Sequence, residues 1–160
     1  MSTVAPCLWF DTQALDAAQY YCSIFPGARI LNVSHYNDAG PRPAGMVMTV
    51  EWEMHGQRFL GLNGGPDLTF DDAISFMVTC ETQAELDSYW EQLTAEGEEG
   101  PCGWCRDRFG LSWQLVPKGM IELVTDPDRD RAARAMKAML SMRKLDLGTI
   151  QEAADAVPAA

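Results

Sequence analysis

The feature that most constrains the fold is an order of elements that occurs twice along the chain. A short apolar segment, "APCLWF" (residues 5–10), precedes a helix-like segment and then several strand-like segments. The same order starts again at "AISFMVTC" (residues 73–80), about 70 residues later. The triplet "TQA" stands at both predicted helix starts, at Thr12 and at Thr82. The repeat favours an α+β protein built as a pseudo-twofold pair of similar halves.

Hydrophobic spacing locates the elements of the first half. Ala14, Leu15 and Ala18 recur at helical spacing and predict a helix that ends near Ile24, before the helix-breaking pair Pro26-Gly27. His55-Gly56 separates two strand-like runs and indicates a tight hairpin turn. Strands are expected at residues 29–36, 46–54 and 57–63.

The second half ends in a helical tail. Thr82 and Glu85 have the spacing of a capping box and predict a second helix that continues to about Thr94. An acidic loop follows, and Asp146 is the expected N-cap of a helix in the tail. The remaining predictions are strands at "CGWCRD" (residues 102–107) and "LSWQLVP" (residues 111–117) and a helical tail at residues 118–160.

Charge and hydropathy exclude several classes of partner. The chain has 12 basic and 23 acidic residues, a net charge of -11, which repels nucleic acid and anionic lipid. No apolar run reaches the ~20 residues of a membrane span, and the first residues do not resemble a signal peptide. We therefore expect no nucleic-acid or membrane partner and a cytoplasmic location, where the five cysteines stay reduced.

The segment "PCGWCR" (residues 101–106) has the C-x-x-C spacing of a redox pair or of half a zinc site. A redox pair usually opens a helix, and strand-like residues follow here instead. In an extended segment Cys102 and Cys105 lie ~10 Å apart, beyond the ~7 Å Cα limit of a disulfide. Zinc needs further ligands that the sequence does not offer nearby. The segment is therefore predicted to be a structural strand.

Three long segments carry a family resemblance: "CLWFDTQALDAAQYYCSIFPGARI", "GLNGGPDLTFDDAISFMVTCETQAELDSYW" and "GPCGWCRDRFGLSWQLVP". They resemble the PhnB-like, or demethylubiquinone methyltransferase-like, family of the glyoxalase/bleomycin-resistance (vicinal oxygen chelate) superfamily, and the likeness extends into "AMLSMRKLDL". The resemblance implies two βαβββ modules, at about residues 5–66 and 70–117, whose mixed sheet curves around a shared cleft. It also implies a homodimer, with all 160 residues in one domain.

The resemblance also shows where a metal would be held. Metal-dependent superfamily members have His and Glu ligands on the first and last strands of each module, and these chelate a divalent ion. The corresponding positions here are Pro6 and Ala73 on the first strands and Gln114 on a last strand. The only histidines, His35 and His55, are interpreted as surface residues. We therefore expect no metal.

A nucleotide-type cofactor is not expected either. The glycine-rich "LNGGPD" (residues 62–67) is not followed by a helix, as a Rossmann-type S-adenosylmethionine site requires. It is interpreted as a turn.

Aromatic and amide side chains on the predicted strands are typical of a small-molecule cleft. The residues expected to bind a ligand are Trp9, Asp11, Asn63, Trp104 and Gln114. Alternation places Gln114 and Trp113 on opposite faces of one strand. The leading hypothesis is a protein that binds a small organic molecule without a metal, its catalytic residues unknown.

Two alternatives stay open from the sequence. The first is a metal-dependent isomerase, lyase or dioxygenase with an atypical ligand set that includes Gln114 and a thiol such as Cys7. The second is a non-catalytic dimeric interaction module whose cleft is filled by side chains.

Overall fold

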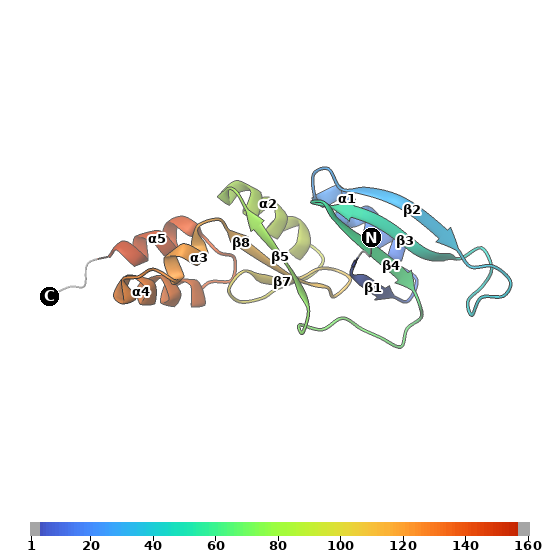
Figure 1. The fold of residues 1–160 in the computed structure, drawn as a ribbon. Helices are drawn as coiled ribbons and strands as arrows, with labels where there is room; N and C mark the ends of the chain where they lie inside the picture. Colours follow the sequence, from blue (N-terminus) through green and yellow to red (C-terminus); the bar gives the residue numbers. More distant parts are fainter. Residues whose placement is uncertain (1–3, 157–160) are drawn as a thin grey trace. The chain divides into compact units, whose positions relative to one another are not determined.

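The computed structural model describes residues 4–156, which form two compact units (Figure 1). The first unit ends at Phe70 and the second begins at Asp71. This division lies next to the junction expected between the two modules. Each unit has its own sheet and its own helix, and each is described separately below.

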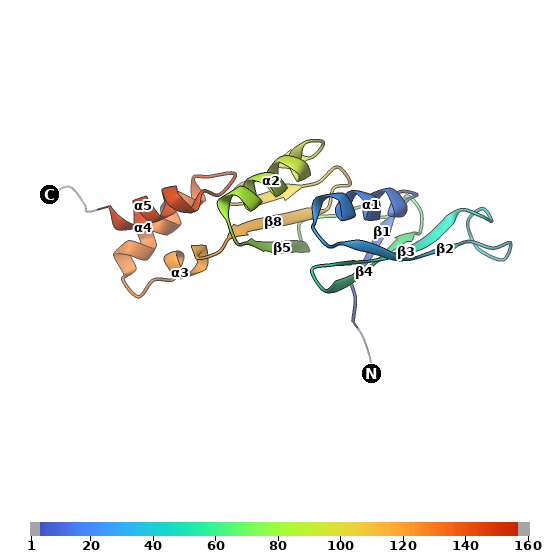
Figure 2. The ribbon, with the colours of Figure 1, turned by 90° about the horizontal axis from the view of Figure 1, so that it is seen from above.

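The first unit is a four-stranded mixed sheet with one helix on one face (Figure 2). Its strand order is β1-β4-β3-β2, in which β1 runs parallel to β4 and the other neighbours are antiparallel. The elements are β1 (Cys7–Phe10), α1 (Ala14–Ile24), β2 (Arg29–His35), β3 (Val47–Met54) and β4 (Gln57–Asn63). These bounds confirm the helix and strands predicted for this half.

Strand β3 explains why the helix packs on one face only. Its residues alternate, and Val50, Trp52 and Met54 are buried while their neighbours are half-exposed. The Trp52 ring stacks on Phe59 of β4 at a centroid distance of 5.3 Å. The hairpin turn lies at His55-Gly56 as predicted, since both have positive φ, at 48° and 77°.

The second unit repeats this topology with different strand lengths. Its order is β5-β8-β7-β6, again with the first strand parallel to the last. The elements are β5 (Ser75–Cys80), α2 (Gln83–Thr94), β6 (Glu98–Glu99), β7 (Trp104–Arg106) and β8 (Ser112–Pro117). The Thr82 hydroxyl caps α2 by accepting a hydrogen bond from the Glu85 amide at 3.1 Å, which confirms the predicted helix start.

Three helices follow the second sheet and belong to the same unit (Figure 1). They are α3 (Met120–Val124), α4 (Arg129–Leu140) and α5 (Leu147–Asp155). The Asp146 carboxylate accepts a hydrogen bond from the Thr149 amide at 2.6 Å and is the N-cap that the sequence predicted. Leu145 and Ile150 fill the core of this part. Within residues 4–156, no helix is long and apolar enough to cross a membrane.

The C-x-x-C segment differs from the prediction. The strand expected at residues 102–107 begins only at Trp104, because Cys102 and Gly103 have φ of 56° and 83° and form a turn. The prediction that both cysteines lie in one extended strand is therefore wrong. Cys102 and Cys105 are free thiols, and burial raises the pKa of Cys105 to about 12.

Candidate functional site

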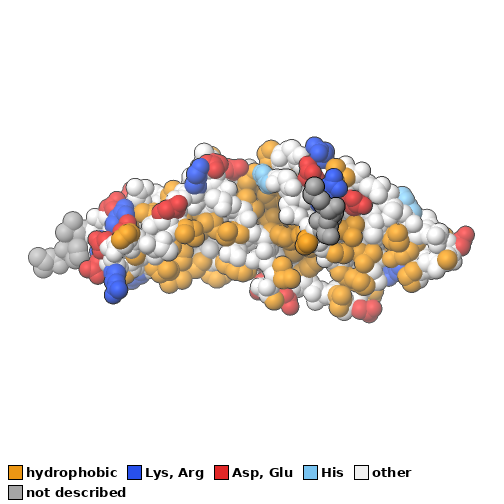
Figure 3. All heavy atoms as spheres, viewed as in Figure 1, with side chains coloured by type: hydrophobic (Ala, Val, Ile, Leu, Met, Phe, Trp, Pro, Cys, Tyr) orange, Lys and Arg blue, Asp and Glu red, His pale blue; other side chains and the backbone are white. Residues whose placement is uncertain are grey.

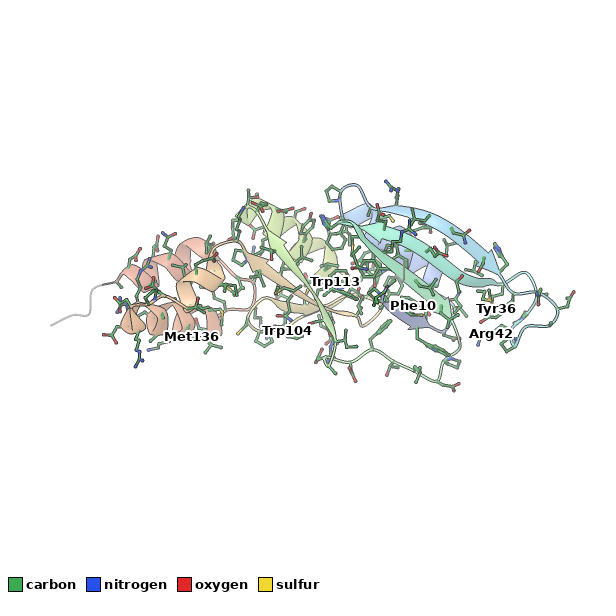
Figure 4. All side chains as sticks on the ribbon, in the orientation of Figure 1. Phe10, Tyr36, Arg42, Trp104, Trp113 and Met136 are labelled. Carbon is green, nitrogen blue, oxygen red and sulfur yellow. The ribbon has the colours of Figure 1, made fainter. Side chains whose placement is uncertain are left out.

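The candidate site lies on the face of the second sheet that carries Met77, Gln114 and Trp104, of which Trp104 is labelled in Figure 4. Strand register sets Gln114 of β8 beside Met77 of β5 and Trp104 of β7. One step along β8, Trp113 is buried on the opposite face, as predicted. Figure 3 shows hydrophobic side chains gathered over these strands, and Met77 is 60% exposed.

Polar side chains on this face are linked in pairs. The Gln114 amide donates to the Ser75 hydroxyl at 2.8 Å. The Arg106 guanidinium donates through Nε and Nη2 to the two oxygens of the Asp72 carboxylate, at 3.0 Å for Nε. The Ser112 hydroxyl donates to the same carboxylate at 2.6 Å. Hydrogen bonds from Arg106 and Ser112 lower the pKa of Asp72 to about 2.

A pocket of about 440 Å³ opens beside this network. Trp104 is half-buried there, so part of its indole is accessible to a ligand. The lining combines this aromatic surface with the fixed charges of the Arg106–Asp72 pair, which is the usual make-up of a small-molecule site. The pocket is lined by Asp72, Glu98, Glu99, Gly100, Pro101, Trp104, Cys105 and Arg106.

The first unit holds the other predicted site residues. Trp9 of β1 is half-buried, and its indole donates to the Gly65 carbonyl at 2.8 Å. Its ring lies so close to Gly64 that a Cβ there would come within 2.2 Å of it. The Asp11 carboxylate accepts a hydrogen bond from Arg42 at 2.9 Å. Hydrogen bonds within the first unit thus hold both side chains in place: Trp9 bonds to the loop after β4, and Asp11 bonds to Arg42. The sequence did not indicate Arg42 as a partner.

Asn63 has a structural environment. Its side chain is 1% exposed, its amide oxygen accepts from the Ala14 amide at 2.9 Å, and its amide nitrogen donates to the Val47 carbonyl at 3.0 Å. It therefore joins the start of α1 to the start of β3. The structure brings Trp104 and Gln114 together, while Asn63 faces the interior of the first unit.

Sequence reasoning missed the charged part of the site. It named neither Asp72 nor Arg106 as a candidate site residue and described the run at residues 96–99 only as part of an acidic loop. A signal for two of these residues was available, because side chains two positions apart in a strand lie on the same face. Arg106 follows Trp104 by two residues, and Ser112 precedes Gln114 by two. Asp72 lies before the strand, so no periodic pattern indicated it.

The residues that could hold a metal are dispersed. Within the described part of the chain, no group of three His, Cys, Asp or Glu side chains could hold an ion. His35 is exposed at the end of β2, and His55 lies in the β3–β4 turn with its ring 5.8 Å from that of Phe25. Cys7 is exposed on β1.

Comparison with known proteins gives the family. Residues 2–116 match the family model described as 3-demethylubiquinone-9 3-methyltransferase. A solved PhnB protein from Bacillus cereus is 30% identical over 72% of this chain and 99% of that one, with a TM-score of 0.65.

Two more distant structures share the fold. A protein from Pseudomonas aeruginosa is 17% identical with a TM-score of 0.61, over 73% of this chain and 98% of its own. The fosfomycin resistance protein of Listeria monocytogenes is 14% identical with a TM-score of 0.50, over 73% and 93%. No curated protein matches the chain.

The matched residues end at position 116, so the expected extension of the likeness into the tail is not part of the family match. They include both sheets and both sheet-covering helices except for the last residue of β8. The chain belongs to the 3-demethylubiquinone-9 3-methyltransferase family, the PhnB-like family that its sequence resembled.

Proposed function

We propose that this protein binds a small organic molecule in the pocket of the second unit without the help of a metal ion. The observation that carries the proposal is a cavity of about 440 Å³ that joins the half-buried Trp104 ring to an anchored Arg106. The ring offers stacking surface, and the guanidinium offers directed donors to a polar group of the ligand.

The geometry around Arg106 supports a binding role. Asp72 accepts from Nε and Nη2, which fixes the plane of the guanidinium, while Nη1 lies 3.8 Å from Glu98. That longer pair can give way to a ligand acceptor at small cost, because exposed ion pairs contribute little. On the same face, the Gln114 amide and the Ser75 hydroxyl bond to each other, and either can form a hydrogen bond with a ligand instead.

A metal-free site is supported by the residues that the family resemblance aligns with the metal ligands of metal-dependent relatives. These positions are Pro6, Ala73 and Gln114, of which two offer no side-chain ligand and the third offers an amide oxygen. Binding by shape, stacking and hydrogen bonds is the function that these side chains can perform.

The test is a ligand screen read by NMR of the methionine methyl groups. Met77 is exposed beside Gln114 and reports on this face, whereas Met136 is 37% exposed on α4 and serves as reference. We expect hits from a library of small aromatic acids and amides to shift the Met77 methyl, and Trp104→Ala to weaken them at least tenfold.

Two outcomes would overturn the proposal. Hits that shift Met136 and leave Met77 unchanged would place binding elsewhere. Binding that disappears after chelation and returns with a divalent ion would show that a metal takes part. The matched control is Tyr20→Ala, which removes a half-buried aromatic ring of α1 in the first unit and leaves every pocket residue unchanged.

A further inference from the structure

Residues 142–147, which follow α4 and end at the first residue of α5, run beside the turn between β6 and β7 and are called the strap here. Its first two carbonyls accept hydrogen bonds from the turn between β6 and β7, residues 100–103. The Cys102 amide donates to the Met142 carbonyl at 2.8 Å, and the Gly103 amide donates to the Arg143 carbonyl at 2.7 Å. The strap thus continues the hydrogen bonding of the second sheet beyond its short edge strands.

Helix α2 holds the strap from the other side. The Gln83 side chain donates to the Leu145 carbonyl at 2.9 Å and accepts from the Leu147 amide at 3.1 Å. One glutamine amide therefore satisfies two backbone groups of the strap. Lys144 adds an ion pair with Asp87 of α2 at 2.7 Å.

Close packing joins the strap to the turn. Leu145 is 1% exposed, and a Cβ at Gly103 would lie 2.9 Å from its Cδ1 and 2.6 Å from the Leu115 carbonyl oxygen. Gly103 also has a φ of 83°. Only glycine combines this backbone conformation with this contact.

The turn that the strap holds is a wall of the pocket. Gly100 and Pro101 line the pocket with Trp104, and the Gly100 amide donates to the Trp104 carbonyl at 2.8 Å. Strand β6 has two residues, so its own pairing gives the turn little support. The position of this wall therefore depends on contacts supplied from outside the sheet.

We propose that the strap is a latch for the pocket: docked between α2 and the β6–β7 turn, it holds the pocket wall in place, and its release opens the wall. The helices of the tail, which lie outside the matched family residues, thereby control access to the site. A signal that acts on the tail can reach the pocket through the Gln83 clamp and the Gly103–Leu145 contact.

The experiment measures alkylation of individual thiols by iodoacetamide at neutral pH, with each site quantified by mass spectrometry. Cys105 follows the turn by two residues and is 2% exposed on the buried face of β7, opposite Trp113, so its thiol reacts slowly while the latch is docked. Gln83→Ala removes both clamp hydrogen bonds, and we expect Cys105 alkylation to rise about tenfold. Gly103→Ala is a second variant, whose Cβ would crowd both Leu145 of the strap and the Leu115 carbonyl of β8. We expect Cys105 alkylation to rise here too.

Two other thiols separate latch release from unfolding. Cys80 is buried in the same unit on β5, and we expect its rate to stay low, while exposed Cys7 keeps its fast rate. Glu91→Gln changes an exposed residue of α2 and is the matched control, with Cys105 unchanged. The proposal is overturned if Cys105 keeps its native rate in both variants, or if Cys80 and Cys105 accelerate together.

Discussion

At the residue scale, Asp72 connects three features of the candidate site. Its carboxylate receives Arg106 from β7 and Ser112 from β8, so it fixes the charged end of the pocket from a position before β5. The hydrogen bonds lower its pKa to about 2. Because the pKa is lowered on folding, the ionised carboxylate stabilises the folded state. This stabilisation is complete at a pH above the ordinary pKa of an aspartate and is lost as the pH falls towards about 2.

Arg106→Gln is expected to raise the pKa of Asp72 from about 2 towards the ordinary value of 3.8, because the largest stabilising partner of the carboxylate is gone. Carbon-detected NMR of the carboxyl group through an acid titration measures this shift. Arg108→Gln is the control, since Arg108 pairs with Glu96 at 3.1 Å. An Asp72 pKa that is the same in the wild type and in Arg106→Gln would contradict the assignment of this pair.

At the element scale, one buried amide holds the first unit's helix to its sheet. Asn63→Ala leaves the Ala14 amide and the Val47 carbonyl without their partner and is expected to destabilise the first unit by about 3 kcal/mol. Urea unfolding followed by circular dichroism checks this value. Asn32→Ala, on the exposed side of β2, is expected to cost less than about 0.5 kcal/mol. Unchanged stability with lost ligand binding would instead favour the binding role predicted from the sequence.

The same scale shows what the sequence could predict. Periodicity located α1 and the long strands, because each buries an apolar face and needs a regular pattern to do so, and the capping box located α2. It did not locate the β6–β7 turn, since Cys102 takes a left-handed conformation that depends on its contact with Met142, 40 residues away. Asn63 looked like a ligand residue because an amide at a strand end is chemically the same whether it meets a ligand or a backbone. The partners of Asp72 could not be predicted either, because a carboxylate in the sequence is the same whether it meets solvent or an arginine.

At the scale of the whole molecule, the repeat in the sequence predicts the two sheets. It does not predict the contacts that the helical tail makes. The two sheets have the same strand order, which the repeated pattern of the sequence predicted, and the family match reaches residue 116. The helices after it were expected as elements, but the hydrogen bonds that tie residues 142–147 to α2 and to the β6–β7 turn were not, because they join residues that no local pattern relates. Gln83 and Leu145 are 62 positions apart.

The last prediction concerns assembly, which the resemblance implied to be a homodimer. Met77 is 60% exposed on β5, a strand at the edge of the second sheet, and a second copy can bury its apolar side chain. We expect a dimer in sedimentation velocity at micromolar concentration, and Met77→Lys to weaken it at least tenfold, because the charge would have to be desolvated. Ile121→Lys is the matched control, since Ile121 is 52% exposed on α3, away from the second sheet's strands, and is expected to leave the dimer intact. A wild-type monomer at these concentrations, or equal weakening by both variants, would show that this surface has another use.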